Sequence, residues 1–289
     1  MVVRSALDRG ERLREAAWIL VPVAVVLVLD LWLDFLGAPV WAKVKVAKPE
    51  TDLALGALSV LAAHAAEPRA VLERFLTGVA ATPLRDLTIE QDLTVFNPEG
   101  RAAFVTGTQR VVVKLPDIQR VEQTLEGRRE VRLTVRGRSW RRAGDGPVTP
   151  IPPEGGQTIA LAVPLHRSVD EVLAEWRTLG VRDDRSHEAR MGGRTVTVIG
   201  AQAGERDRPA AWIDPEYGIV RFVAREPITT GSVLTDVVFS DYRPLLGPLF
   251  FPHRQETFRS GKLILRLIAR SVAVNTSPPE SLFDPAGLK

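Results

Sequence analysis

The chain has 289 residues, 45% of them hydrophobic and 25% charged, which suits a globular protein with one substantial core. It contains no cysteine, which excludes disulfides, thiolate metal sites, thiol nucleophiles and lipid attachment through an N-terminal cysteine. The formal net charge of +3 is too small to indicate a nucleic-acid partner, although it could favour an anionic membrane surface.

The N-terminal region carries two apolar runs. They can be interpreted as a membrane anchor or as a signal peptide, and in both cases the rest of the chain is exported. Residues 16–40 are long enough to cross a bilayer, which requires ~20 residues, and Asp30 and Asp34 lie in the distal half of this run. A second run, 53–63, ends in Ala63-His64-Ala65, which is typical of a signal peptide cleaved after Ala65. It could equally be a helix that connects an anchor to the domain. We therefore expect residues 1–65 to be an anchor or export segment and residues 66–289 to be the folded domain.

Two helices are predicted in that domain. Pro68 suits the first turn of a helix over residues 68–80, in which Val71, Leu72, Phe75, Leu76 and Val79 form one apolar stripe. Ser168 and Glu171 form a capping-box pattern that begins a helix over residues 168–179, and Gly180 is its stop signal. The apolar face of each helix must cover another apolar surface.

The remaining pattern has a period of two and predicts strands. Residues 87–95 and 130–136 alternate between apolar and polar side chains, as in strands that have one buried and one solvent-exposed face. Further strands are expected at 104–114, 118–125, 157–163, 194–200, 209–214, 219–226, 233–240, 255–259 and 262–274. Residues 143–156 and 201–208 are predicted loops. The fold class is therefore α+β but mostly β: a curved antiparallel half-barrel of about eleven strands, with helices closing a hydrophobic cavity and an N-terminal apolar helix before it.

The C-terminal region resembles the closing hairpin of the LolA-like family of periplasmic lipoprotein-sorting carriers. The residues that carry this resemblance are Ser240-Asp241-Tyr242-Arg243, Gly247-Pro248, Phe251-Pro252, the turn Ser260-Gly261, Asn275 and Leu282-Phe283-Asp284-Pro285. Earlier segments are similar in order and spacing: Phe96-Asn97-Pro98-Glu99-Gly100, Lys114-Leu115-Pro116, Arg136-Gly137-Arg138-Ser139-Trp140 and Trp212-Ile213-Asp214-Pro215-Glu216-Tyr217-Gly218. Together these segments span roughly three quarters of the chain.

The resemblance implies a binding protein and not an enzyme. It implies a monomeric periplasmic carrier that takes acyl chains of lipoproteins or another amphiphile from an inner-membrane donor to an outer-membrane acceptor. If the N-terminal segment is retained, residues 16–40 tether this carrier to the inner membrane. The alternative is a membrane-tethered sensor or scaffold that detects lipid or lipoprotein state. No cofactor, metal or nucleic acid is expected. The candidate cavity residues are Leu93, Val95, Val113, Leu133, Val135, Trp140, Leu161, Val172, Trp176, Trp212, Phe222 and Phe258.

One position departs from the family pattern. An arginine that latches the helical lid in the lipoprotein carrier is replaced by Leu115, so a different cargo or opening trigger is expected.

Signals for catalysis or metal binding are weak. The four histidines lack the spacing of a metal site, and His187-Glu188 beside Asp183-Asp184 is expected in a solvated polar connector. Scattered serines lack a nucleophile-elbow motif, so a tethered hydrolase is a third hypothesis that no sequence motif supports. Seven arginines gather in one hairpin, either on a solvated strand face or on a docking surface for anionic lipid headgroups or an acidic partner: Arg128, Arg129, Arg132, Arg136, Arg138, Arg141 and Arg142.

Overall fold

The computed structural model describes residues 67–97, 99–151, 167–228 and 231–288. Its two α-helices are α4 (Pro68–Ala80) and α6 (Val169–Thr178), and two 3-10 helices, η1 (Glu280–Phe283) and η2 (Pro285–Gly287), lie near the C-terminus. The strands are β1 (Asp86–Phe96), β2 (Ala103–Lys114), β3 (Ile118–Leu125), β4 (Arg128–Val135), β5 (Arg138–Ala143), β6 (Thr149–Ile151), β7 (Ser186–Met191), β8 (Arg194–Ile199), β9 (Ala210–Asp214), β10 (Gly218–Ile228), β11 (Gly231–Leu246), β12 (Leu249–Arg259) and β13 (Lys262–Val274).

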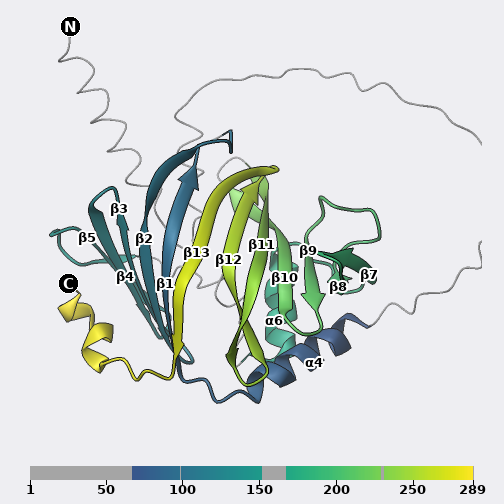
Figure 1. The fold of residues 1–289 in the computed structure, drawn as a ribbon, viewed down its shortest axis with the longest axis horizontal. Helices are drawn as coiled ribbons and strands as arrows, with labels where there is room; N and C mark the ends of the chain where they lie inside the picture. The colour runs from purple at the N-terminus through teal and green to yellow at the C-terminus, as the bar shows by residue number, and fades with distance from the viewer. Residues whose placement is uncertain (1–66, 98, 152–166, 229–230, 289) are drawn as a thin grey trace, which may run out of the picture.

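All thirteen of these strands form one antiparallel sheet, which is curved and unclosed (Figure 1). The order is β6-β5-β4-β3-β2-β1-β13-β12-β11-β10-β9-β8-β7. Consecutive strands therefore pair with each other, except β6 and β7, which form the two edges of the sheet, and strands distant in sequence pair at the centre. There β1 pairs with β13, with Leu87 opposite Val274 and Leu93 opposite Leu267. The first and last strands of the domain therefore hold its two halves together.

One face of the sheet, which we call the inner face, packs against both helices. The helix-covered cluster joins α4 and α6 to residues from β1–β3 and β8–β13, so the sheet wraps around the helices. Its most deeply buried side chains include Leu72, Leu87, Ile89, Val111, Trp176 and Phe222. The predicted curved antiparallel sheet with helices on one face is confirmed.

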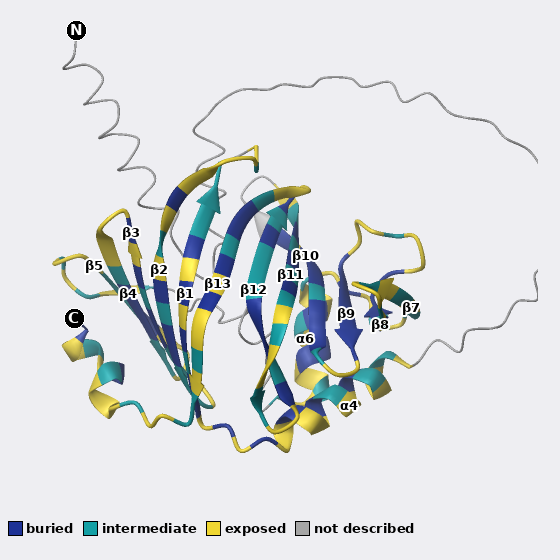
Figure 2. Ribbon diagram, in the orientation of Figure 1, coloured by how far each residue is buried: buried dark blue, intermediate teal, exposed yellow. Residues whose placement is uncertain are grey.

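The opposite, outer face is also covered in two places. The outer cluster lies on β8–β10 and consists of Val196, Val198, Ala201, Ala210, Trp212, Val220 and Val223. The tail cluster joins strands β2 and β4 to the C-terminal segment and consists of Val112, Val131, Leu133, Phe283 and Leu288. Strand β9 has a cluster on each face and is therefore buried along its whole length (Figure 2).

Both predicted helices are confirmed, and the number of strands is corrected. Pro68 stands in the first turn of α4, and the capping box of Ser168 and Glu171 begins α6. Strands β5, β6 and β7 were absent from the prediction, and β6 falls in a stretch expected to be loop. The expected strand at 157–163 and the N-terminal apolar helix lie outside the described residues. Within the described ranges, no helix is long and apolar enough to span a bilayer.

Candidate functional site

The helix-covered cluster is closely packed where α6 meets the sheet. Val172 and Trp176 are each 1% exposed, and the Trp176 ring lies 5.5 Å from the ring of Phe222 on β10. A ligand chain can enter this part of the inner face only if α6 moves, because close-packed interiors leave no room for an added chain.

Helices α4 and α6 are joined to each other and to the sheet by few polar contacts. The Arg69 guanidinium donates to both carboxylate oxygens of Asp170 over 2.7 and 3.3 Å, and this ion pair lowers the pKa of Asp170. The backbone N–H of Arg225 donates to the carbonyl of Leu179 just after α6 (2.8 Å). The Arg69–Asp170 pair is exposed, so apolar packing holds the two helices in place.

A second apolar cluster on the inner face is built from strands alone. This strand cluster consists of Leu93, Val105, Leu125, Ile264, Leu265 and Leu267, with Val95 packed against it. Its members come from β1, β2, β3 and β13, and none of them from α4 or α6. Part of the apolar surface of the inner face is therefore formed by strand residues alone, without any residue of α4 or α6.

A row of polar side chains separates the two apolar clusters. Strand register places Glu130, Gln123, Gln109 and Gln91 side by side on β4, β3, β2 and β1, and Ala269 of β13 follows. His253 of β12 comes next, with Nδ1 3.4 Å from the carbonyl oxygen of Ala269. We call Glu130, Gln123, Gln109, Gln91 and His253 the polar row. The amide of Gln91 donates through Nε2 to Oε1 of Gln109 over 2.6 Å.

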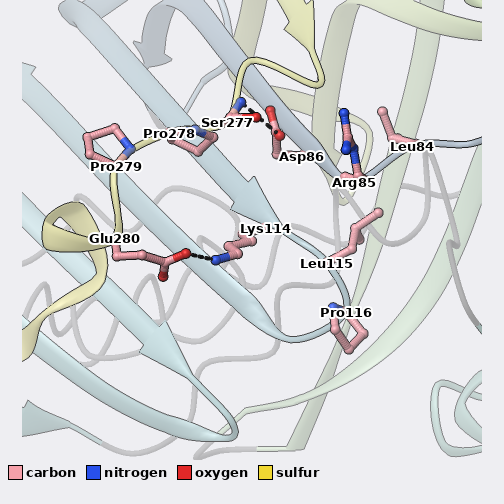
Figure 3. A pocket seen from close by; sticks show the side chains of 10 residues that line it. All are labelled: Leu84, Arg85, Asp86, Lys114, Leu115, Pro116, Ser277, Pro278, Pro279 and Glu280. Carbon is pink, nitrogen blue, oxygen red and sulfur yellow. Dashed lines mark hydrogen bonds and ion pairs between the residues drawn. The ribbon is translucent and has the colours of Figure 1, made fainter.

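A groove of about 920 Å³ opens at the rim of the helix-covered cluster, between the start of β1, the end of β2 and the segment after β13 (Figure 3). Leu84 and Leu115 line it and also belong to, or pack against, the helix-covered cluster. The Asp86 carboxylate accepts hydrogen bonds from the backbone of Thr276 (2.7 Å) and Ser277 (3.1 Å), which fixes the segment after β13. Lys114 pairs with Glu280 across the groove. The groove thus opens to solvent at the edge of the helix-covered cluster.

Six predicted cavity residues lie on the inner face. Val113, Val172, Trp176 and Phe222 belong to or pack against the helix-covered cluster, and Leu93 and Val95 lie in the strand cluster. Leu115, the predicted latch position, follows β2, and its N–H donates to the carbonyl of Arg85 over 3.0 Å. It is partly buried among apolar side chains.

The structure places five other predicted residues on the outer face. Leu133, Val135 and Trp140 pack in or against the tail cluster. Trp212 lies in the outer cluster, with the Arg221 guanidinium 4.4 Å above its ring. Phe258 stands opposite Asp236, the partner of Arg221. These five are left out of the site, and Leu161 lies outside the described residues.

Sequence reasoning missed the polar row, although the printed sequence holds a signal for it. Gln91 occupies an inward position in the same alternation as Leu87, Ile89 and Leu93, where an apolar residue is expected. Gln109 and Gln123 interrupt their strands in the same way.

The histidine and the acidic residues of the predicted polar connector have separate partners. His187 and Glu188 lie on β7 and not in a connector, which corrects the prediction, and His187 Nδ1 is 2.9 Å from the carbonyl of Ala201. Asp183 pairs with Arg177, and Asp184 with Arg182. No group of three or more His, Asp or Glu side chains that could hold a metal ion occurs in the part of the chain that the structure describes.

Three arginines of the arginine-rich hairpin, Arg129, Arg132 and Arg141, lie within ion-pair distance of glutamates of the same sheet. Arg132 and Arg141 lie near Glu130 (2.5 and 4.0 Å), and Arg129 pairs with Glu122 (3.0 Å). Burial alone would raise the pKa of Glu122, but hydrogen bonds from Arg120 and Arg129 lower it overall. For these three arginines the contacts favour a structural role, whereas Arg136 and Arg138 are exposed at the turn between β4 and β5.

Comparisons with known proteins give likenesses of fold. No protein-family model matches the chain, and no curated protein matches it. A DUF1329 family protein from Desulfovibrio piger is 12% identical with a TM-score of 0.50, over 77% of this chain and 98% of that one. An outer membrane lipoprotein-sorting protein domain from Vibrio parahaemolyticus, described in its name as putative, is 11% identical (TM-score 0.48; 75% and 96% covered). A LolA superfamily protein from Nitrosomonas europaea is 10% identical (TM-score 0.45; 76% and 98% covered). At these identities the likeness concerns the fold alone.

Proposed function

We propose that this protein is a periplasmic carrier that holds acyl chains of lipoproteins, or of another amphiphile, against its inner face. The observation that carries the proposal is the division of that face into two apolar clusters, only one of which includes residues of α4 and α6. Concave apolar surfaces with a few polar groups are where proteins bind such ligands.

Binding requires burial and no covalent step. Each buried CH₂ group contributes ~0.8 kcal/mol. Leu93 and Leu267 are only 3% and 4% exposed, so a ligand chain first contacts the strand cluster at Val95, its partly buried member. Deeper insertion displaces α6, whose Trp176 and Val172 occupy the helix-covered cluster. Release then needs an acceptor that offers a better apolar surface.

The cellular setting belongs to the same proposal. Residues 1–65 export the domain or anchor it to the inner membrane, an inner-membrane donor and an outer-membrane acceptor exchange the cargo, and the carrier works as a monomer. Mass spectrometry of the native protein, extracted without harsh detergent, should reveal co-purified lipid.

A charge at the edge of the strand cluster should weaken lipid binding. Val95 is partly buried on the inner face, and Val95→Asp would place a carboxylate against the bound chain, which costs free energy without a partner. We expect at least a tenfold loss of affinity for a pyrene-labelled diacyl phospholipid, or ~1.4 kcal/mol.

The neighbouring residue supplies the matched control. Thr94 is also partly buried, but its side chain points to the outer face, opposite Arg266. Thr94→Asp should therefore leave lipid affinity within about twofold of wild type. Equal losses in the two variants, or none in Val95→Asp, would rule out the strand cluster as the chain-binding surface.

A further inference from the structure

The groove at the start of β1 opens among arginines that are exposed to solvent. Arg85 lines the groove, and Arg136 and Arg138 flank the turn between β4 and β5. None of these three side chains forms an ion pair within the ranges that the structure describes. An exposed guanidinium without a carboxylate partner keeps its charge and its donors for an anion from outside the chain. We call Arg85, Arg136 and Arg138 the basic rim.

The backbone of the sheet holds the basic rim on one end of the molecule. The carbonyl of Arg85 accepts from the N–H of Leu115 (3.0 Å), which joins the start of β1 to the end of β2. Strand register then leads from Lys114 of β2 across β3 and β4 to Arg138 of β5. Four strand spacings separate Arg85 from Arg138, or about 19 Å at ~4.8 Å per strand. The basic rim is therefore a broad surface and not a single anion site.

The carboxylates beside the basic rim do not cancel its charge. Asp86 accepts from the backbone of the segment after β13, and Glu280 pairs with Lys114. Asp117, in the turn after β2, is exposed and has no ion pair among the described residues. Its carbonyl accepts from the N–H of Arg136 over 3.1 Å. Three unpaired cations thus face one unpaired anion, so this end of the sheet attracts negative charge.

Apolar side chains lie next to the cations in the groove. Leu84 is 3% exposed and belongs to the helix-covered cluster, and Leu115 packs against the same cluster. Pro116, exposed at the turn after β2, forms the outer lip of the groove (Figure 3). Cations around an apolar opening match the boundary of a bilayer, where phosphate groups lie beside hydrocarbon. A folded acidic protein would supply the charge but no hydrocarbon.

We propose that the basic rim docks on an anionic bilayer surface, with the groove facing the lipids. The headgroups of anionic phospholipids are the partner that this surface binds. The inference goes beyond the proposed carrier function, because docking does not require that any chain is carried.

A fluorescent label in the groove tests the docking on the full chain. The protein contains no cysteine, so Ser277→Cys creates one labelling site at an exposed position that lines the groove. A polarity-sensitive dye at this site should shift its emission to shorter wavelength with vesicles of phosphatidylcholine and phosphatidylglycerol. Vesicles of phosphatidylcholine alone should give no shift. The shift should also disappear at about 0.5 M NaCl, where the screening length falls to roughly 4 Å.

A second label position controls for attachment through another part of the chain. Gln202 is exposed in the connection between β8 and β9, away from the groove. The same dye at Gln202→Cys should keep its emission wavelength with both kinds of vesicle. Residues 1–65 are present in every sample, so vesicle binding through them does not account for a difference between the two positions.

Removing the three charges should remove the docking. Combining Arg85→Gln, Arg136→Gln and Arg138→Gln in the chain labelled at Ser277→Cys should raise the concentration of mixed vesicles needed for half of the shift at least tenfold. Each arginine near an anionic surface contributes to that attraction. The replaced side chains are exposed, so the melting temperature should stay close to that of the wild type.

An equal loss of charge elsewhere provides the matched control. Arg101, Arg190 and Arg206 are exposed, lie outside the basic rim and have no ion pair within the described ranges. Their triple replacement by glutamine should change the vesicle titration by less than about threefold, because screening limits their effect.

The outcomes decide the docking without reference to cargo. A shift of the Ser277→Cys label that is equal with both kinds of vesicle, or absent with both, would overturn the proposal. An equal effect of the two triple replacements would overturn it as well, since only net charge would then matter. The carrier proposal would stand in each of these cases, because it is tested by co-purified lipid and by Val95→Asp.

Discussion

At the scale of the residue, Asp214 organises the turn between β9 and β10. Its side chain is 1% exposed and accepts from Arg194 over 2.5 and 3.0 Å, and from the backbone N–H groups of Glu216 (2.8 Å) and Tyr217 (3.0 Å). Desolvation raises the pKa of this carboxyl, but the Arg194 and backbone hydrogen bonds outweigh it and lower the pKa below its usual 3.8. Tyr217 then stacks on Tyr242, with ring centroids 4.9 Å apart. One carboxylate thus sets the turn next to the helix-covered cluster.

Asp214→Ala should destabilise the domain by about 2–3 kcal/mol. A broken buried ion pair costs 3–5 kcal/mol, and the 41% exposure of Arg194 reduces that figure. Because the folded-state pKa lies below the unfolded value, the contribution of Asp214 is fully present above about pH 4 and is lost as pH falls through the folded-state pKa. Urea unfolding at pH 7 and pH 3 should therefore show a smaller gap between wild type and variant at pH 3.

The neighbouring Glu216 provides the control for that measurement. It is 49% exposed and contacts the same arginine, so Glu216→Ala should change the free energy of unfolding by less than about 1 kcal/mol. A gap for Asp214→Ala that stays the same at both pH values would contradict the assigned pKa direction.

At the scale of the element, Gly218 determines how closely α4 approaches the sheet. Its φ is +79°, and a Cβ atom added there would lie 2.2 Å from the ring of Phe75, which is far inside van der Waals contact. The helix lies at the end of β10 where this turn occurs (Figure 1). Only glycine combines this backbone conformation with this close approach.

Gly218→Ala should displace α4 and cost about 1–2 kcal/mol more than backbone strain alone. Gly137 is the matched control, because its φ of +76° is nearly the same but open space surrounds the added Cβ. Gly137→Ala should lose only ~1 kcal/mol from the left-handed conformation. Chemical denaturation of both variants measures the difference. Equal losses would show that Phe75 moves freely and that α4 is not tightly seated.

Local signals predicted most elements of the fold, and the exceptions have physical causes. The capping box of α6 and the Ser260-Gly261 turn are determined by a few neighbouring residues. Strand β7 lies at the edge of the sheet and is partly exposed to solvent, so it carries the polar residues His187, Glu188 and Arg190. These residues obscure the alternation of apolar and polar side chains by which a strand is predicted. Strand β6 has only three residues.

The candidate site was harder to predict than the elements. Alternation separates the two faces of a strand but does not identify the inner one, and here both faces are covered by apolar clusters. Leu133 and Trp212 therefore carry the same signal as Leu93 and Phe222, although they lie on opposite faces. Only the pairing of distant strands, β1 with β13, settles which residues share a face.

At the scale of the whole molecule, the C-terminal segment packs on part of the outer face of the sheet, so that apolar side chains are buried on both faces of the sheet. Phe283 and Leu288, 7% and 1% exposed, pack on Val112 and Leu133. The Arg120 guanidinium donates to the carbonyl of Leu282 (2.9 Å), and Arg142 donates to that of Leu288 (2.7 Å). The outer face of β2–β5 is thus closed by the chain itself.

The two ends of the chain should therefore differ in their effect on folding. A chain that begins at Ala66 keeps every described element, and we expect it to remain folded, with a β-rich circular dichroism spectrum and an unchanged melting temperature. A chain that ends at Ser277 loses Phe283 and Leu288, which exposes Leu133 and Val112 and should cost about 3 kcal/mol or more, since burying one such side chain contributes ~1.5–3 kcal/mol. Its exposed apolar strands should also bind hydrophobic dye and promote aggregation. Unfolded material from the first truncation would place the domain boundary upstream of Ala66. A melting temperature unaffected by the second truncation would mean that the C-terminal segment contacts the sheet without stabilising it.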